Sequence, residues 1–272
     1  MHKYSEKKLS LIFILFLGIV FLYTVSPSTL SAAWDVETID SIGPYGAFPS
    51  MAIDSNNKMH ISYNNNNDEI KYATNASGSW VTSIVDVLDY ALYNSSIAID
   101  SNNKIHISYL GDCDLKYATN ASGLWVTEKI DDTTCGVFYF SIAIDFNDKV
   151  HIGYSYYNDL KYATNASGSW VTETIPNAGN VSKYTSTAVD SNNKVHISYY
   201  DANQDLRYAT NKTGVWTTSI IDGTGDMGQY NSIAIGSNNK VYIGYCHYYW
   251  DNEWGDFYEL KYATNAYWFV GY

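Results

Sequence analysis

Positive charge is scarce in this 272-residue chain. It has 16 lysine and arginine residues against 28 aspartate and glutamate residues, which gives a formal net charge of −12. Only one residue, Arg207, is an arginine. A protein that binds nucleic acid must neutralise phosphates with a basic surface, so we expect no nucleic-acid partner. Binding to an anionic membrane surface is disfavoured for the same reason.

Proline and glycine are also few, with four and 18 residues, whereas tyrosine contributes 27. An excess of tyrosine with Asn, Ser and Thr is typical of strands and polar turns, and a 3.6-residue apolar period is absent. Hydrophobic residues make up 46% of the chain, which is enough for a sizeable core. The composition therefore predicts an all-β fold.

The long apolar run of the chain lies near the N-terminus, from Leu9 to Val25. Basic residues precede the run, and Ser31 and Ala33 follow it at the −3 and −1 positions of a small-residue cleavage site. This order predicts a secretory signal peptide over residues 1–33 and a secreted or cell-surface domain over residues 34–272. The run is about 17 residues long, the low end of what spans a bilayer, so an uncleaved N-terminal anchor stays open as the one membrane attachment.

A unit of about 45 residues occurs five times in succession. The segment at 50–63 returns at 96–109, 141–154, 186–199 and 232–245. A second block, Lys-Tyr-Ala-Thr-Asn-Ala-Ser-Gly, stands at 71–78, 116–123 and 161–168, with variants at 207–214 and 261–266. Each unit contains four short β-patterned runs separated by turn residues, which is the pattern of a β-propeller blade.

The two ends of the repeat region indicate how the ring closes. Trp34–Asp40 resembles the fourth run of a unit, such as Trp170–Ile175, but has no first three runs before it. The fifth unit has three runs and then a shortened turn. We therefore predict five four-stranded blades, with the N-terminal strand completing the last one. The alternative is that residues 268–272 are the fourth strand and the chain is part of a larger ring.

These repeats resemble known propeller families. The segment Thr74–Trp80 stands in the turn between the third and fourth strands, where sialidase-type propellers have their Asp-box, although Ala76 replaces the aspartate and the glycine-to-tryptophan gap is one residue shorter. The Ser-Ile-Ala-Ile-Asp, His-Ile-Ser-Tyr and Leu-Lys-Tyr-Ala blocks resemble secreted prokaryotic propeller repeats. Blade number and length are similar to five-bladed lectins of the tachylectin type. The resemblance covers nearly all of 34–266 and implies architecture without a specific activity.

Strand direction predicts two faces of different character. The turns within each hairpin are nearly identical in every unit, which is typical of a structural role. The loops between the second and third strands, and the connections between blades, vary and lie on the opposite face. Binding residues concentrate on loops held by a rigid scaffold, so this variable-loop face is the candidate binding surface.

Aromatic and acidic residues gather in these variable loops, and rings with polar edges suit pyranose sugars. The insertion at 246–258 supplies the candidate ligand-binding residues Tyr248, Tyr249, Trp250, Asp251, Trp254 and Asp256. Other loops supply Tyr139, Tyr184, Tyr230, Tyr156 and Tyr200. The alternative for each tyrosine is packing between blades.

Five equivalent positions, four residues before each repeated alanine, are predicted to surround the mouth of the central channel. They are Phe48, Asn94, Tyr139, Tyr184 and Tyr230. These side chains either stack on a ligand or plug the axis.

Other repeated polar residues have structural explanations. Histidines recur at 60, 106, 151 and 196, but equivalent positions in neighbouring blades lie roughly 10 Å apart, too far to share a zinc ion. We expect them to form hydrogen bonds, and we expect no metal or cofactor. An acid and a base two residues apart in each third strand, such as Asp159 and Lys161, can pair locally or across blades. Of the three cysteines, Cys113 and Cys135 fall in adjacent loops and can form a disulfide, which leaves Cys246 over.

The function classes follow from these features. Sialidases of the Asp-box class hold a carboxylate with three arginines, so the single arginine excludes that activity. The repeats are close to interchangeable, which favours a non-catalytic binding module whose leading ligand is a glycan. The alternatives are a cell-surface scaffold that captures a cell-envelope protein and, with less support, a glycoside hydrolase that uses two carboxylates.

Overall fold

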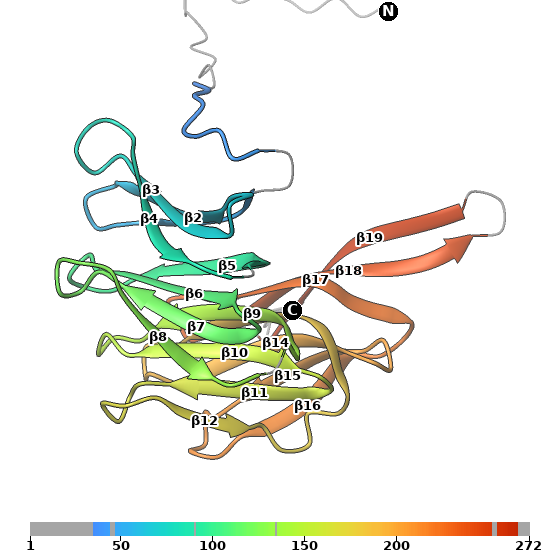
Figure 1. Cartoon of the computed structure of the whole chain (residues 1–272). Coiled ribbons are helices and arrows are strands. Elements are labelled where there is room, and N and C mark those ends of the chain that lie inside the picture. Colours follow the sequence, from blue (N-terminus) through green and yellow to red (C-terminus); the bar gives the residue numbers. More distant parts are fainter. Residues whose placement is uncertain (1–34, 44–46, 90, 134, 252–254, 266–272) are drawn as a thin grey trace, which may run out of the picture. The chain divides into compact units, whose positions relative to one another are not determined.

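The computed structural model describes residues 35–43, 47–89, 91–133, 135–251 and 255–265. The chain divides into two units, Met1–Glu37 and Thr38–Tyr272, and all 19 described strands belong to the second (Figure 1). No helix in the described ranges is long and apolar enough to cross a bilayer. The all-β prediction is confirmed for the described residues.

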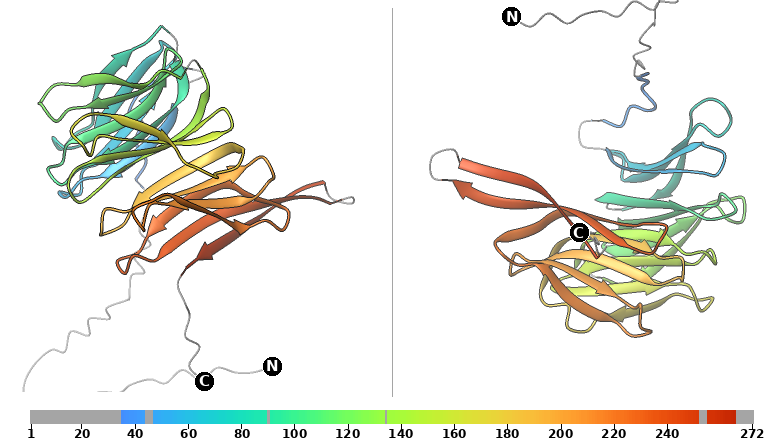
Figure 2. Two further views of the ribbon diagram at one scale, coloured as in Figure 1. Left: turned by 90° about the horizontal axis from the view of Figure 1, so that it is seen from below. Right: turned by 180° about the vertical axis from the view of Figure 1, so that it is seen from behind.

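The strands form five antiparallel sheets in chain order (Figure 2). The first sheet contains β1 (Ala47–Ile53), β2 (Met59–Asn64), β3 (Glu69–Thr74) and β4 (Val81–Val87). The second contains β5 (Ala91–Ile99), β6 (Ile105–Gly111), β7 (Asp114–Thr119) and β8 (Val126–Asp131). The third contains β9 (Val137–Ile144), β10 (Val150–Tyr156), β11 (Asp159–Thr164) and β12 (Val171–Thr174). The fourth contains β13 (Val181–Val189), β14 (Val195–Asp201), β15 (Leu206–Thr210) and β16 (Thr217–Asp222). The fifth contains β17 (Asp226–Ile235), β18 (Val241–Asp251) and β19 (Gly255–Thr264).

The turns between first and second strands are fixed by one aspartate in each of the first four sheets. In the first sheet, the Asp54 carboxylate accepts hydrogen bonds from the backbone N–H groups of Asn56 and Lys58, both at 2.8 Å. Asn57 takes a positive φ of 58°, which asparagine tolerates better than most residues. The repeated Asp-Ser-Asn-Asn sequence is thus a hairpin turn.

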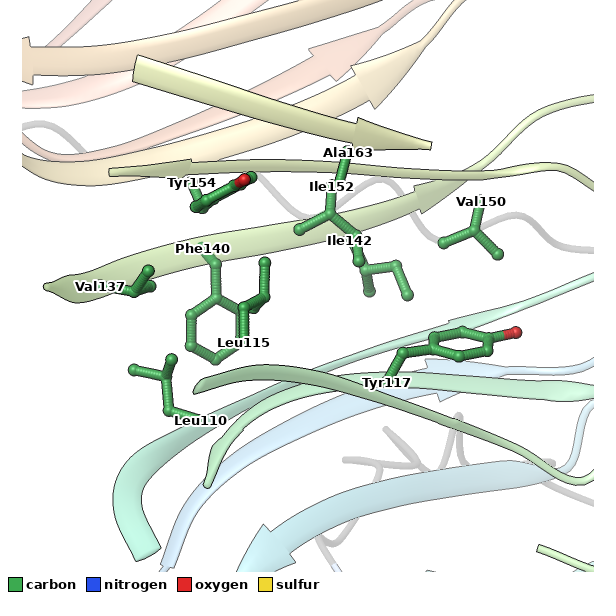
Figure 3. Close-up of a cluster of buried hydrophobic side chains, with 10 residues drawn as sticks. All are labelled: Leu110, Leu115, Tyr117, Val137, Phe140, Ile142, Val150, Ile152, Tyr154 and Ala163. Carbon is green, nitrogen blue, oxygen red and sulfur yellow. The ribbon is translucent and has the colours of Figure 1, made fainter. Parts of the chain in front are cut away.

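The hydrophobic core lies between consecutive sheets. Leu115 and Tyr117 of β7 pack against Phe140, Ile142 and other buried residues of the third sheet (Figure 3). Equivalent clusters lie between the first and second, third and fourth, and fourth and fifth sheets. The first strands of consecutive sheets also contact one another: β1 contacts β5, β5 contacts β9, β9 contacts β13, and β13 contacts β17. The first strand is therefore the innermost strand of each sheet, as the blade pattern predicts.

A tryptophan packs edge-on against a tyrosine at three of these sheet interfaces. Each tryptophan immediately precedes the fourth strand of one sheet, and each tyrosine lies in the third strand of the preceding sheet. The pairs are Trp125 with Tyr72, Trp170 with Tyr117 and Trp216 with Tyr162, with ring centroids 5.0–5.2 Å apart.

A tyrosine–aspartate–lysine cluster joins the fourth strand of one sheet to the following sheet at three of the four interfaces between described sheets. In the third sheet, the Tyr154 hydroxyl donates to Asp131 at 2.7 Å, and Lys161 pairs with the same carboxylate. Equivalent clusters form on Asp40, Asp86 and Asp222. In these four clusters the lysine pairs with an aspartate that precedes its own sheet and not with the acid two residues before the lysine, although Lys116 lies closer to Asp112 of its own sheet. In the fourth sheet, Tyr199 instead donates to the Ala178 carbonyl, and Arg207 pairs with Asp201.

The repeated histidines form the hydrogen bonds that the sequence analysis expected. His151 Nδ1 lies 2.5 Å from the Tyr162 hydroxyl, and its Nε2 lies 3.2 Å from Asp145. Burial lowers the pKa of His151 despite this carboxylate, so the imidazole is held neutral. His60, His106 and His196 have equivalent partners.

The fifth sheet differs from the other four because it contains three described strands. Residues 35–40 form no strand, and residues 266–272 lie outside the described ranges. The fourth strand of this sheet, and with it the closure of five blades, stays a prediction.

Candidate functional site

The variable-loop face is assembled by backbone hydrogen bonds between its two kinds of loop. The loop between the second and third strands is hydrogen-bonded to the chain that leads into the next sheet in each of the first four sheets, as in Cys135 N–H to Cys113 O at 3.0 Å and Met227 N–H to Gln204 O at 2.8 Å. Cys113 and Cys135 form a disulfide between the same two kinds of loop, and Cys246 is unpaired. The disulfide pairing is the one expected from the sequence.

Three tyrosines of consecutive first strands form a row on this face. The ring centroids of Tyr139 and Tyr184 lie 5.0 Å apart, and those of Tyr184 and Tyr230 lie 4.5 Å apart. Tyr230 is 60% exposed at the end of the row. We call these three residues the tyrosine row. It offers aromatic surface to solvent next to two rings that support it.

Irregular backbone geometry sets the direction in which two of these rings point. Tyr184 and Tyr230 take φ values of 51° and 52°, which are uncommon for non-glycine residues, and both stand at shifts in strand register. Such bulges re-aim side chains, and strain of this kind gathers at functional sites. The Asn231 amide donates to the Tyr184 carbonyl at 2.6 Å, so one sheet holds the backbone of its neighbour.

Hydrogen bonds of buried side chains hold the tyrosine row in place. Burial, and then the hydrogen bond with Tyr230, raises the pKa of Tyr184, so its hydroxyl stays protonated at neutral pH. Tyr200 lies 6.3 Å from Tyr184 between ring centroids and is buried. Its hydroxyl donates to Asp226 at 2.9 Å, and Gln229 donates to the other oxygen of that carboxylate. Tyr200 therefore supports the row and presents little surface to a ligand.

A second aromatic group lies where β18 and β19 extend beyond the length of the other hairpins (Figure 1). We call residues 247–251 and 255–259 the aromatic ribbon. Tyr248 faces Tyr258 across the two strands with centroids 5.2 Å apart, and Tyr249 stacks on Phe257 at 5.5 Å. Trp250 is 64% exposed. Both faces of the ribbon thus carry aromatic rings.

A carboxylate orients one of these rings. The Tyr248 hydroxyl donates to Asp256 at 2.5 Å, and this hydrogen bond raises the pKa of Tyr248. Asp226, which binds Tyr200 beneath the tyrosine row, is the register partner of Tyr248 in the β17–β18 pair. Asp226 therefore connects the two aromatic groups.

The structure places the other predicted residues as follows. Tyr156 packs against Tyr157 with centroids 4.8 Å apart, and Lys161 Nζ lies 4.8 Å from the Tyr156 centroid, so Tyr156 belongs to a separate group. Asp251 pairs with Gly255 at the end of the ribbon. Trp254 lies outside the described residues.

The sequence analysis did not identify two residues that contribute to the candidate site. Phe257 pairs with Tyr249 across the ribbon, and a continuous alternation through 247–258 would have predicted it. Asp226 is the first residue of β17, and no sequence pattern links it to Tyr200, because the two residues meet only across neighbouring sheets.

The site is rich in acceptors but not in metal ligands. Among the described residues no group of three or more His, Cys, Asp or Glu side chains could hold a metal ion. Asp226 and Asp256 already accept tyrosine hydroxyls, which orients their oxygens. Asp205 has a raised pKa because of burial and then repulsion from Asp201, but Asp201 itself is bound to Arg207 in a loop turn. This arrangement suits binding of hydroxyl-bearing ligands.

Comparisons with known proteins address the fold. No protein-family model matches the chain, and no curated protein matches it in sequence. Solved structures do match it at low identity. Aleuria aurantia lectin, described as a six-bladed β-propeller with a fucose recognition mode, is 14% identical with a TM-score of 0.55, over 79% of this chain and 77% of the lectin.

Two further structures match to a similar degree. SapL1 lectin, solved with alpha methyl fucoside, is 16% identical with a TM-score of 0.53, over 80% of this chain and 82% of SapL1. A protein of unknown function from Dyadobacter fermentans is 10% identical with a TM-score of 0.54, over 79% of this chain and 78% of that protein. At these identities the likeness establishes architecture alone: the chain has the β-propeller fold.

Proposed function

We propose that this protein is an exported, non-catalytic module that binds glycans through the variable-loop face. The observation that carries the proposal is the tyrosine row, in which Tyr139, Tyr184 and the exposed Tyr230 of neighbouring sheets lie ring against ring and the last two have irregular backbone. A pyranose ring has an apolar face that stacks on an aromatic ring and hydroxyls that bind carboxylates and amides. The row and the aromatic ribbon supply both kinds of contact.

The structural neighbours suggest which glycans to test first. Aleuria aurantia lectin and SapL1 are described with fucose ligands and share the propeller architecture. We therefore propose fucose-containing glycans as the first candidates. The N-terminal charged and apolar segment supports export, with a secreted or cell-surface location.

We also propose that the five repeats complete one ring of five blades, with residues 34–40 as the last strand. Two features support this count. The chain contains five repeat units, and Asp40 binds Tyr63 and Lys71 as Asp131 binds Tyr154 and Lys161. A closed ring places all variable loops on one rigid face.

A glycan array tests the function. Fluorescently labelled protein covering residues 34–272, shown to be folded by its circular dichroism and cooperative melting, should bind a chemically related set of glycans at micromolar to millimolar affinity. A blank array with folded protein would contradict the proposal and favour capture of a cell-envelope protein. Release of free sugar from a bound glycan would favour a glycoside hydrolase instead.

A variant pair tests the contribution of the aromatic ribbon. Trp250→Ala removes a 64% exposed ring and should weaken glycan binding without changing the melting temperature. Phe146→Ala is the matched control, because Phe146 is 72% exposed but lies in a hairpin turn on the opposite face. Unchanged binding in Trp250→Ala and Trp254→Ala would remove the ribbon from the site.

A further inference from the structure

A pocket lies between the fourth and fifth sheets, at the position where the preceding interfaces hold an indole ring. A cavity of about 100 Å³ is lined by Tyr208 of β15, by Val241 and Ile243 of β18 and by Ala263 of β19, among other residues. The equivalents of these four residues in the preceding interface are Tyr162, Val195, Ile197 and Ala209. Trp216 packs against that cluster.

The same comparison holds at the other two interfaces. Trp125 packs against the cluster that contains Tyr72, and Trp170 packs against the cluster that contains Tyr117. The cluster that contains Tyr208 has no tryptophan among its described members. The repeat therefore specifies the occupant of the pocket as the tryptophan that begins the fourth strand of the fifth sheet.

We propose that this occupant is Trp34, and that residues 34–40 dock on β19 as the missing fourth strand. The inference rests on the five-bladed ring of the proposed function and not on the ligand. The spacing of the segment fits: Trp34 and Asp40 are separated by six residues, as are Trp125 and Asp131, and Trp216 and Asp222.

Asp40 fixes the other end of this strand. In the repeat, the aspartate at the end of a fourth strand binds the tyrosine and lysine of the following sheet, as Asp222 binds Tyr245 and Lys261. Asp40 makes these contacts with Tyr63 and Lys71 of the first sheet. Residues 34–40 are thus the fourth strand of the sheet that precedes the first, and in a ring of five that sheet is the fifth.

Two uncovered apolar surfaces give independent support. On the fifth sheet, Leu260 and Tyr262 are 86% and 68% exposed, whereas their third-sheet equivalents Leu160 and Tyr162 are 0% and 5% exposed. On the first sheet, Met51 is 59% exposed, whereas its equivalents in the other four sheets are 6–8% exposed. These surfaces are the two halves of one more interface of the kind that joins the other sheets.

The C-terminal alternative fits the turn geometry poorly. Each described turn between third and fourth strands contains a glycine with φ near 92°, namely Gly78, Gly123, Gly168 and Gly214. After Asn265 the chain reads Ala-Tyr-Trp, with no glycine before Trp268 and two fewer residues between Thr264 and that tryptophan. A side chain at such a φ is strained, so the sequence after Asn265 fits the repeat turn less well than the four glycine-containing sequences do.

A cysteine cross-link tests the docking and its register. In the third sheet Ala163 pairs with Thr172, and the equivalent pair in the proposed strand is Ala263 with Val36. We would introduce Ala263→Cys and Val36→Cys into the complete chain in a Cys246→Ser background. Ala163→Cys with Thr172→Cys is the positive control, and Leu260→Cys with Val36→Cys is the register control.

The proposal predicts a cross-link within one molecule for the Ala263–Val36 pair, as for the positive control, and none for the register control. Cross-linked dimers, or no cross-link where the positive control forms one, would overturn it. Glycan binding by the same variants keeps the two proposals apart: binding without the cross-link rejects the docking alone, and a cross-link without binding rejects the ligand alone.

Thermal melting provides a second readout. Trp34→Ala should lower the melting temperature by roughly 6–12 °C, as should Trp216→Ala, because each removes a packed indole. Trp250→Ala, which removes an exposed indole, should change it little. A Trp34→Ala melting temperature equal to that of the unsubstituted chain would also overturn the proposal.

Discussion

The clusters that join each fourth strand to the next sheet make a quantitative prediction for two equivalent tyrosines. Tyr154 and Tyr199 are both 0% exposed, and both donate a hydrogen bond to a residue that precedes the first strand of their own sheet. Tyr154 donates to the Asp131 carboxylate at 2.7 Å, whereas Tyr199 donates to the Ala178 carbonyl at 3.0 Å. The acceptor is charged at the first site and neutral at the second, where the Arg207 guanidinium also interacts with the Tyr199 hydroxyl.

The expected losses in the free energy of unfolding follow from the charge of the acceptor. A hydrogen bond to a charged group contributes about 1.5–3 kcal/mol, and one to a neutral group about 0.5–1.5 kcal/mol. Tyr154→Phe should therefore lower the free energy of unfolding by about 1.5–3 kcal/mol. Tyr199→Phe should lower the free energy of unfolding by about 0.5–1.5 kcal/mol. Phenylalanine preserves the packing in both variants, so each loss reports the hydrogen bond of the hydroxyl.

Urea unfolding followed by tryptophan fluorescence measures both values. The denaturant dependence should be the same for the two variants, so that the midpoints report stability alone. An Asp131→Asn background should shrink the loss in Tyr154→Phe and leave the loss in Tyr199→Phe unchanged. Equal losses in the two single variants, or a larger one in Tyr199→Phe, would refute the reasoning.

Three other perturbations have defined outcomes. The free energy of unfolding should fall as the pH drops below about 6.5, by up to about 1.4 kcal/mol per pH unit for each buried histidine. The reason is that the imidazole takes up a proton in the unfolded chain at a pH at which the folded chain keeps it neutral. A urea midpoint that is equal at pH 7.5 and pH 5.5 would contradict this prediction. The histidines with lowered pKa values are His106, His151 and His196. Reducing the Cys113–Cys135 disulfide, which spans 22 residues, should cost about 3 kcal/mol, and reductant should have no effect on a Cys113→Ser/Cys135→Ser variant. Gly168→Ala should cost about 1–2 kcal/mol because of its φ of 93°, whereas Ser169→Ala, at an exposed position of the same turn without a positive φ, should be nearly neutral; equal losses would exclude backbone strain as the cause.

The repeat made the architecture accessible from the sequence. Strand positions, hairpin turns and the hydrogen-bonding role of the histidines follow from local patterns that occur in nearly every unit. The partner of Lys161 could not be read in this way. Asp159 is two residues away, but the lysine pairs with Asp131 on the preceding sheet, because the end of that strand lies directly across the interface.

The candidate site was predictable in its location but not in the role of each residue. The variable loops do hold the tyrosine row and the aromatic ribbon. Tyr200, however, is buried because Asp226 of the next sheet accepts its hydroxyl hydrogen bond, a contact that strand patterns do not contain. Tyr156 lies apart from the row because it packs on Tyr157 and Lys161 within its own sheet.

The measurement that tests the central claim most directly is a calorimetric titration of the best array glycan into three proteins: the unsubstituted chain, Tyr230→Ala and Phe146→Ala. Both variants remove an exposed aromatic ring, one from the variable-loop face and one from the hairpin-turn face. The proposal predicts that Tyr230→Ala weakens binding about tenfold or more, the equivalent of about 1.4 kcal/mol, while Phe146→Ala binds as the unsubstituted chain does. Unchanged affinity in Tyr230→Ala, or a loss confined to Phe146→Ala, would contradict a glycan site on the variable-loop face.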